Sequence, residues 1–213
     1  MEFKNKVVLI TGGGTGIGKK TAHLFLEQGA CVVINGRRKD MLENTGRELD
    51  PSGERLTWVV GDMGRKETAA RLVQTAVQRF GGVDVLINNA GIFKPTAFLD
   101  YSEDAVDANL TAIFKSAFFA SQAAIPAMKT RGGGAIVCIG SMWAMQAIGA
   151  TPSSAYSAAK AGVHALTRNL AIEFAKDNIR VNAVAPAIVE TPVFETFLAP
   201  EQVKHVLSTF NAF

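Results

Sequence analysis

The chain has 213 residues, of which 48% are apolar and 19% charged, a length and composition that suit one domain with a sizeable core. The formal net charge is +3 and the basic residues are scattered, which disfavours a nucleic-acid-binding protein. No segment approaches the ~18 consecutive apolar residues of a membrane span, and the polar start MEFKNK does not indicate a signal peptide. We therefore expect a cytoplasmic protein that binds neither nucleic acid nor membrane.

Short apolar runs alternate with longer segments of helical period along the chain. Nearly all residues of the runs are apolar, as expected when helices cover both faces of a sheet. Strands that alternate with helices predict a parallel sheet with right-handed crossovers, whose ligands bind beyond the carboxyl ends of the strands. The predicted strands are Val7–Ile10, Cys31–Ile34, Leu56–Val60, Val83–Ile87, Ala135–Ile139 and Ile179–Val184. The predicted helices are Gly16–Gln28, Arg38–Leu49, Lys66–Phe80, Glu103–Lys129 and Ser154–Lys176.

A glycine-rich turn, TGGGTGIG at residues 11–18, follows the first predicted strand. Glycines there let the backbone approach a phosphate, and the N-terminus of the next helix attracts anions. The spacing is G-x-x-x-G-x-G, from Gly12, Gly16 and Gly18, and not G-x-G-x-x-G. A P-loop is a near miss, because Lys20 stands where a metal-binding Ser or Thr is needed. An ordinary tight turn is the remaining alternative.

The segment Asn35-Gly36-Arg37-Arg38 follows the second predicted strand. A domain that holds NAD usually has an acid here for the ribose hydroxyl, and this segment has none. Arg37 offers a planar guanidinium suited to a phosphate. The sequence therefore favours NADP, with NAD still possible, over the plainer reading of a solvated basic pair.

Polar residues also follow the third and fourth predicted strands. Asp62 is placed either to accept a hydrogen bond from an adenine amino group or to cap the next helix. The segment Asn88-Asn89-Ala90-Gly91 suits a turn, because Asn and Gly tolerate positive φ. Since the fourth strand is expected beside the first, a structural role around a cofactor is favoured for this turn.

Tyr156 and Lys160 lie four residues apart near the start of a predicted helix, so they share one helix face. A free phenol titrates near ~10 and is a poor base at neutral pH. A nearby cation favours phenolate and lowers that pKa. The pair is therefore a candidate acid/base, and the ordinary alternative is a surface Tyr with a Lys one turn on.

Metal and hydrolase signatures are missing from the sequence. There is no C-x-x-C, H-E-x-x-H or G-x-S-x-G, so we expect no metal site and no α/β-hydrolase. Cys31 and Cys138 belong to apolar runs and fit buried, reduced thiols. His23, His164 and His205 are dispersed, and we expect them in packing or at the surface.

Together these motifs resemble the short-chain dehydrogenase/reductase family. The resemblance runs from about Lys6 to Thr191, most of the chain. It rests on the shared order of TGGGTGIG, NNAG, the Asn of DANL, a Ser after the fifth strand, and YSAAK. It implies a Rossmann-type α/β fold, a doubly wound parallel sheet in three layers, and a nicotinamide cofactor.

The resemblance implies a catalytic tetrad of Asn109, Ser141, Tyr156 and Lys160. Tyr156 would be the general acid/base at the substrate oxygen, and Lys160 would lower its pKa and hold the nicotinamide ribose. Ser141 would hydrogen-bond the substrate oxygen, and Asn109 would order the helix and the water that relay the proton. Ser153 and Ser154 are closer to Tyr156 in sequence, but they would fall at the helix start as caps.

The resemblance also implies which residues surround the cofactor. Gly12, Ile17 and Gly18 would line the pyrophosphate, Asp62 and Asn89 would lie near the adenosine half, and Thr191 would contact the nicotinamide amide. The full expected set is Gly12, Thr15, Ile17, Gly18, Arg37, Asp62, Met63, Asn89, Ala90, Gly91, Tyr156, Lys160, Pro186, Val189 and Thr191.

The C-terminal region departs from the family, whose members usually continue into another helix and a seventh strand. We expect one domain over residues 1–213, with a C-terminally truncated substrate lid at 190–213. The helices around 109–128 and 156–173 are apolar on more than one face, and the family commonly assembles through them, so we expect a homo-oligomer, a dimer or a tetramer. The apolar residues of the tail are Phe194, Phe197, Leu198, Val203, Val206, Leu207 and Phe210.

The sequence leads to one main functional hypothesis, an NADP(H)-dependent oxidoreductase acting on a ketone or secondary alcohol. The alternative is a dinucleotide-binding protein without turnover because its C-terminal part is missing, and a P-loop nucleotide hydrolase ranks third. An apolar substrate pocket, or simply core, is indicated by Met142, Trp143, Met145, Phe93, Phe98, Phe194 and Phe197.

Overall fold

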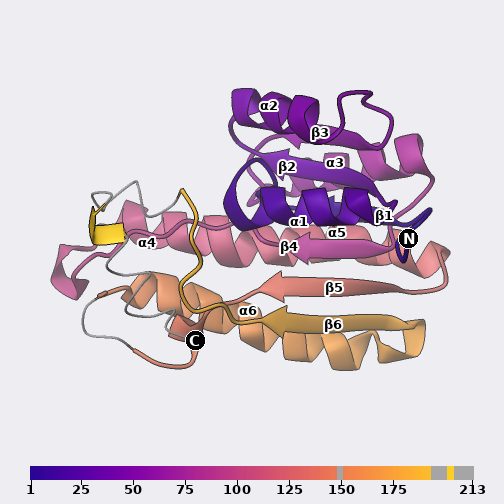
Figure 1. Cartoon of the computed structure of the whole chain (residues 1–213). Helices are drawn as coiled ribbons and strands as arrows, with labels where there is room; N and C mark the ends of the chain where they lie inside the picture. The colour runs from indigo at the N-terminus through magenta and orange to yellow at the C-terminus, as the bar shows by residue number, and fades with distance from the viewer. Residues whose placement is uncertain (148–150, 193–200, 204–213) are drawn as a thin grey trace.

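The computed structural model describes residues 1–147, 151–192 and 201–203. Within these residues, six strands form one parallel sheet in the order β3-β2-β1-β4-β5-β6 (Figure 1). The order reverses between β1 and β4, and the strand arrows in Figure 1 point toward one edge of the sheet. This is the predicted doubly wound fold. The strands are β1 Val7–Ile10, β2 Cys31–Gly36, β3 Leu56–Val60, β4 Val85–Asn88, β5 Gly134–Ile139 and β6 Ile179–Val184.

Helices lie on both faces of the sheet. Side chains alternate along each strand, so neighbouring residues such as Val8 and Leu9 enter two separate apolar clusters. One cluster includes α1 and α2, and the other includes α3, α5 and α6. The helices are α1 Gly16–Glu27, α2 Lys39–Leu49, α3 Lys66–Phe80, α4 Glu103–Asn109, α5 Ser116–Thr130 and α6 Ser154–Glu173. Shorter segments are the 3-10 turns η1 Phe98–Asp100, η3 Met142–Ala144 and η4 Ala175–Asp177, and the π-helix η2 Leu110–Lys115.

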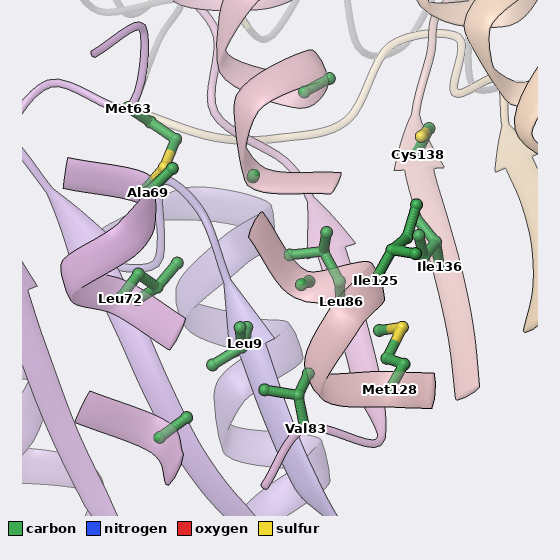
Figure 2. Packing of buried hydrophobic residues seen from close by; sticks show 14 of the residues in the cluster. Leu9, Met63, Ala69, Leu72, Val83, Leu86, Ile125, Met128, Ile136 and Cys138 are labelled. Carbon is green, nitrogen blue, oxygen red and sulfur yellow. The ribbon is translucent and has the colours of Figure 1, made fainter. Parts of the chain in front are cut away.

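The cluster beneath α3, α5 and α6 is the larger core. Figure 2 shows Leu72 of α3 and Met128 of α5 converging on Leu9 and Leu86 of the central strands. Each of these four residues is at most 1% exposed to solvent. At ~25 cal/mol per Å² of apolar surface removed from water, such burial is the main favourable term for folding. It holds the central strands rigid, and their ends position the site.

Several predicted elements begin or end one to three residues away from their observed bounds, and two differences have a clear local cause. The fourth strand begins at Val85 and not at Val83, because the Asp84 carboxylate accepts the Val7 N–H at 2.9 Å and pairs with Lys6 and Arg131 at the strand entrance. The predicted helix Glu103–Lys129 is interrupted by the π-helix η2, where an extra residue per turn shifts the helix face. Apolar periodicity does not reveal this insertion, because residues on both sides of it are apolar.

Several local predictions agree with the structure. Gly81 ends α3 in the left-handed conformation with φ +85°, as a glycine cap requires. Cys31 and Cys138 are free thiols as predicted; Cys138 is buried, whereas Cys31, predicted to be buried, is only partly so. Among the described residues, no helix is long and apolar enough to cross a membrane. Of the apolar tail, only Val203 lies within the described residues, so most of the expected lid and its phenylalanines lie outside them.

Candidate active site

A cleft of about 470 Å³ lies at the carboxyl ends of the strands, where β1 and β4 lie side by side. Its lining comes from the segments that follow β1 to β6, together with the start of α6. Of the predicted cofactor residues, all except Gly18 line this cleft. Of the predicted tetrad, Ser141, Tyr156 and Lys160 line it and Asn109 does not. The topology thus gathers in one place residues that are far apart in the sequence.

The glycine-rich turn is closely packed on the end of β4. Gly12 has φ +66°, and a β-carbon there would lie 3.0 Å from the Ala90 Cα atom. A β-carbon on Gly18 would overlap the Gly12 carbonyl oxygen, so Gly18 seats α1 against the turn and does not line the cleft. Thr15 makes no side-chain cap at the N-terminus of α1, and no acid lies in its first turn. The backbone N–H groups at the N-terminus of α1 therefore have no competing side-chain acceptor, and they suit an anion such as a pyrophosphate.

A hydrogen-bonded clamp joins the ends of β1 and β4. The Thr11 hydroxyl accepts the backbone N–H groups of Asn89 and Ala90 at 3.0 and 2.9 Å. The Asn89 side-chain amide donates to the carbonyl oxygens of Thr11 and Gly12 at 2.9 and 3.0 Å. Asn89 therefore holds the glycine-rich turn in shape, as the predicted structural role requires. Thr11 was not among the predicted site residues, although it holds this clamp together. The only indication in the sequence was its position directly after the first predicted strand, at the start of the TGGG motif.

Two arginines lie at the mouth of the cleft beside the end of β2. Arg37 and Arg38 both line the cleft and are exposed. Neither makes a side-chain ion pair or hydrogen bond with another described residue. Asn35 is buried and its amide donates to the Val59 and Gly61 carbonyl oxygens at 2.9 and 3.1 Å, so it braces the loops. The site that would face the adenosine ribose therefore has positive charge and no acid from β2.

Asp62 and Met63 follow β3 and also line the cleft. The Asp62 carboxylate accepts the Gly64 N–H at 2.9 Å, while α3 takes Arg65 as its N-terminal cap residue. Asp62 thus stabilises the turn before the helix and does not cap the helix itself. The predicted contact of Asp62 with an adenine amino group stays a prediction.

The end of the cleft that holds the predicted catalytic residues, called here the catalytic end, contains buried polar side chains. Ser141 is 3% exposed and Lys160 is 5% exposed. The Ser141 hydroxyl is hydrogen-bonded to Tyr156, and it accepts the Trp143 N–H at 3.2 Å. The Lys160 ammonium donates to the Ile139 carbonyl oxygen at 2.5 Å and lies 5.8 Å from the centre of the Tyr156 ring. Burial lowers the pKa of Lys160 to about 8.

The pKa of Tyr156 differs from its expected direction. We expected Lys160 to lower it, but burial raises it above its ordinary value, and the hydrogen bond from Ser141 offsets only part of that rise. The physical reason is that the phenol is largely buried, and burial disfavours the charged phenolate. Burial thus favours the neutral phenol of Tyr156 over the phenolate.

An aromatic wall adjoins the tyrosine. The Phe93 ring packs edge-on against Tyr156 with 4.8 Å between ring centres, and Trp143 lies 6.0 Å from Phe93. The Trp143 indole N–H donates to the Thr151 hydroxyl at 3.0 Å, so its polar atom is satisfied and apolar surface lines the cleft. Phe93 and Trp143 were predicted as pocket or core; both line the cleft, and only Trp143 is also buried.

The comparisons with known proteins agree with this geometry. Residues 6–202 match the family model described as short chain dehydrogenase. The chain belongs to the short-chain dehydrogenase family. It is 38% identical over 202 residues to the (2S)-[(R)-hydroxy(phenyl)methyl]succinyl-CoA dehydrogenase subunit BbsD of Thauera aromatica, covering 95% of this chain and 80% of the relative. An uncharacterised oxidoreductase of Thermotoga maritima is 38% identical over 191 residues, covering 90% of this chain and 74% of the relative. A short-chain type dehydrogenase/reductase from Mycobacterium marinum superposes with a TM-score of 0.89 at 31% identity, over 97% of this chain and 80% of the other.

As a short-chain dehydrogenase, the protein catalyses NAD(P)-dependent hydride transfer. The cleft fits a dinucleotide, because Gly12 and Gly18 pack the turn too closely for a β-carbon and the backbone N–H groups at the start of α1 have no capping side chain. Among the described residues, His, Cys, Asp and Glu side chains form no group of three or more that could hold a metal ion.

Asn109 occupies a different place in this dehydrogenase from the other tetrad members. It ends α4, directly before the π-helix, and is 8% exposed. Its amide donates to the Ala105 carbonyl at 2.9 Å. π-turns occur frequently at functional sites, and η2 packs against α6, which carries Tyr156. The expected role of Asn109 in ordering a helix and water remains a prediction.

Proposed function

We propose that this short-chain dehydrogenase is an NADP(H)-dependent ketone reductase, with secondary-alcohol oxidation as the reverse reaction. The observation that carries the proposal is the buried Ser141–Tyr156–Lys160 group, which shares one cleft with the glycine turn and the two arginines. Burial raises the pKa of Tyr156 and so favours the neutral phenol, the form that donates a proton in reduction. Without this group, the cleft would be only a nucleotide site.

The chain's own residues supply position and proton transfer. When bound, the nicotinamide cofactor supplies a hydride to the substrate carbon, or accepts one from it. The Tyr156 hydroxyl donates its proton to the carbonyl oxygen as negative charge develops there, and Ser141 donates a hydrogen bond to the same oxygen. Lys160 places a positive charge behind the phenol and favours the phenolate left after transfer. The Ile139 carbonyl holds that ammonium in place before the reaction.

The preference for NADP rests on Arg37 and Arg38. Both guanidinium groups are exposed at the end of the cleft beside β2, and neither is engaged with another described residue. A guanidinium donates two parallel hydrogen bonds to a phosphate. An acid that would favour a free ribose hydroxyl is missing from the end of β2.

The substrate we propose is a ketone with an apolar flank. Phe93 and Trp143 face the cleft next to Tyr156, and the nearby Pro186, Ala187 and Val189 are also uncharged. The Thauera relative is named for a substrate with a hydroxy(phenyl)methyl group, a secondary alcohol beside a ring. That name supports the secondary-alcohol chemistry proposed for this chain.

The alternative of a dinucleotide-binding protein without turnover is not favoured, because the family match extends through residue 202 and the catalytic residues lie together. The homo-oligomer and the cytoplasmic location remain predictions. Analytical ultracentrifugation of the purified chain tests the first.

The test of the proposed function is the change Tyr156→Phe, which keeps the ring and removes the proton. We expect turnover of aryl ketones with NADPH to fall by about 10²–10⁴, while the dissociation constant of NADPH, measured by fluorescence, changes little. Tyr101→Phe is the matched control, because Tyr101 is the other tyrosine in the sequence and does not line the cleft. Full activity in Tyr156→Phe would refute the assigned mechanism.

A further inference from the structure

His164 has an unusual environment for a residue that we expected in simple packing. It lies on α6, one turn after Lys160, and is half-buried. Its Nε2 atom is buried and has no hydrogen-bond partner among the described residues. A buried polar atom without a partner costs free energy, so its position requires a physical reason.

The imidazole is pressed against the backbone of Gly140. A β-carbon at position 140 would overlap the His164 ring at Nε2, so any residue larger than glycine would displace the imidazole or the Gly140 backbone. On its other side, Gly140 donates its N–H to the Val184 carbonyl of β6 at 2.8 Å. The Gly140 backbone is thus held between β6 and His164. Ser141 is the next residue, so its position depends on where Gly140 lies.

Three residues on one face of α6 contact the end of β5. Tyr156, Lys160 and His164 are spaced four residues apart, which places them in one row. Tyr156 is hydrogen-bonded to Ser141, Lys160 donates to the Ile139 carbonyl, and His164 packs on Gly140. One helix face therefore supports three consecutive residues, 139 to 141, of the segment that carries the catalytic serine.

We propose that His164 is a positioning residue, whose imidazole braces Gly140 and thereby sets the Ser141 hydroxyl against Tyr156. The proposal rests on the proposed catalytic roles of Ser141 and Tyr156. A shift of ~1 Å in a positioned group is enough to cost about 10² in rate, so a displacement of Gly140, the residue before Ser141, is expected to slow the reaction. The unpartnered Nε2 atom is the part of the imidazole that packs on the Gly140 backbone.

The test is a cycle of Gly140→Ala, His164→Ala and the double variant. We expect His164→Ala to lower kcat about tenfold and Gly140→Ala about 10², because the added methyl displaces the segment before Ser141. In the His164→Ala background the methyl has room, so the penalty of Gly140→Ala should shrink to less than about threefold. NADPH affinity should stay within about twofold throughout, because the brace acts on Ser141 and not on the cofactor.

Three outcomes overturn the proposal: an unchanged kcat in His164→Ala, an equal Gly140→Ala penalty in both backgrounds, or a loss of NADPH affinity that parallels the loss of kcat. If Gly140→Ala alone fails to fold, kcat of His164→Ala still decides. The control is His23→Ala, because His23 is a partly exposed histidine on α1; its kcat should equal that of the wild type. Ser141→Ala separates the two proposals, because full activity there refutes the serine's role, whereas a loss there with none in His164→Ala refutes only the brace.

Discussion

The two ends of the cleft are built by opposite means. One end, called here the phosphate end, is where we propose that the cofactor phosphates bind. Backbone amides and the glycine turn form its surface, and its two arginines, Arg37 and Arg38, are exposed. At the catalytic end, the surface is formed by side chains, and the charged group, Lys160, is 5% exposed. Exposed charges keep their ordinary chemistry and are screened by salt, whereas a buried charge changes its pKa. Binding and chemistry are therefore expected to respond to different perturbations.

The largest expected effect comes from Lys160→Met, which removes the buried charge. We expect kcat to fall by about 10²–10⁴, because the phenolate left by proton transfer loses its neighbouring cation. Stability should rise by about 2 kcal/mol at pH 7, because the folded chain no longer buries an ammonium. Thermal unfolding and steady-state kinetics on the same protein measure both changes.

The pH dependence of that stability gain follows from the pKa of Lys160. It is about 8 in the folded chain and 10.5 ordinarily, so between these values the unfolded chain binds a proton that the folded chain does not. Wild-type stability therefore gains with pH over this window, and the full cost of the buried charge is present below about pH 8. The advantage of Lys160→Met should be largest below pH 8 and should shrink toward pH 10.5; an advantage that grows with pH contradicts the assignment.

At the phosphate end, Gly18→Ala is the change with the largest expected effect. Its β-carbon overlaps the Gly12 carbonyl oxygen, so the turn must move away from α1. We expect the dissociation constants of NADPH and NADH to rise together by about 10², as measured by fluorescence titration. Gly53→Ala is a matched control, since a β-carbon there meets no atom within 4 Å, although its φ of +68° gives a modest loss of stability. Equal cofactor affinities in both variants would exclude the glycine turn as the pyrophosphate site.

A smaller effect is expected for the pair Arg37→Ala and Arg38→Ala. We expect each to weaken NADPH binding by about tenfold and NADH binding by less than about twofold, since a lost phosphate contact is worth ~1.5–3 kcal/mol at most when exposed. The NADPH preference of the wild type should also decrease as salt is added. If NADH binds the wild type more tightly than NADPH, the cofactor assignment is wrong while the family membership stands.

The smallest effect is expected at the aromatic wall. Trp143→Ala should lower kcat/KM for an aryl ketone such as acetophenone by about tenfold and leave a small aliphatic ketone within about threefold. Thr151→Val, which frees the indole N–H, is the milder test and should cost about twofold. Equal losses on both ketones would show that the wall supports Tyr156 without selecting the substrate.

The strands and the end of α3 at Gly81 could be predicted from the sequence. Apolar runs and a glycine cap each depend on only a few neighbouring residues. The sequence also placed Ser141, Tyr156 and the glycine turn at strand ends or on the expected helix, and the topology brings them to one cleft. The π-helix η2 was not predictable in this way, because an inserted residue between two apolar stretches leaves no mark in the pattern.

Tertiary structure decided what those residues do to one another. Spacing put Lys160 on the same helix face as Tyr156, but only packing against β5 directs its ammonium to the Ile139 carbonyl. Likewise, only burial in the folded chain raises the pKa of the tyrosine. The burial of Gly18 against Gly12, and of His164 against Gly140, likewise depends on segments distant in the chain. Composition and spacing describe residues that are close in the sequence. Desolvation and steric fit depend on which distant segments pack against a residue, so burial and contacts within the site could be known only from the tertiary structure.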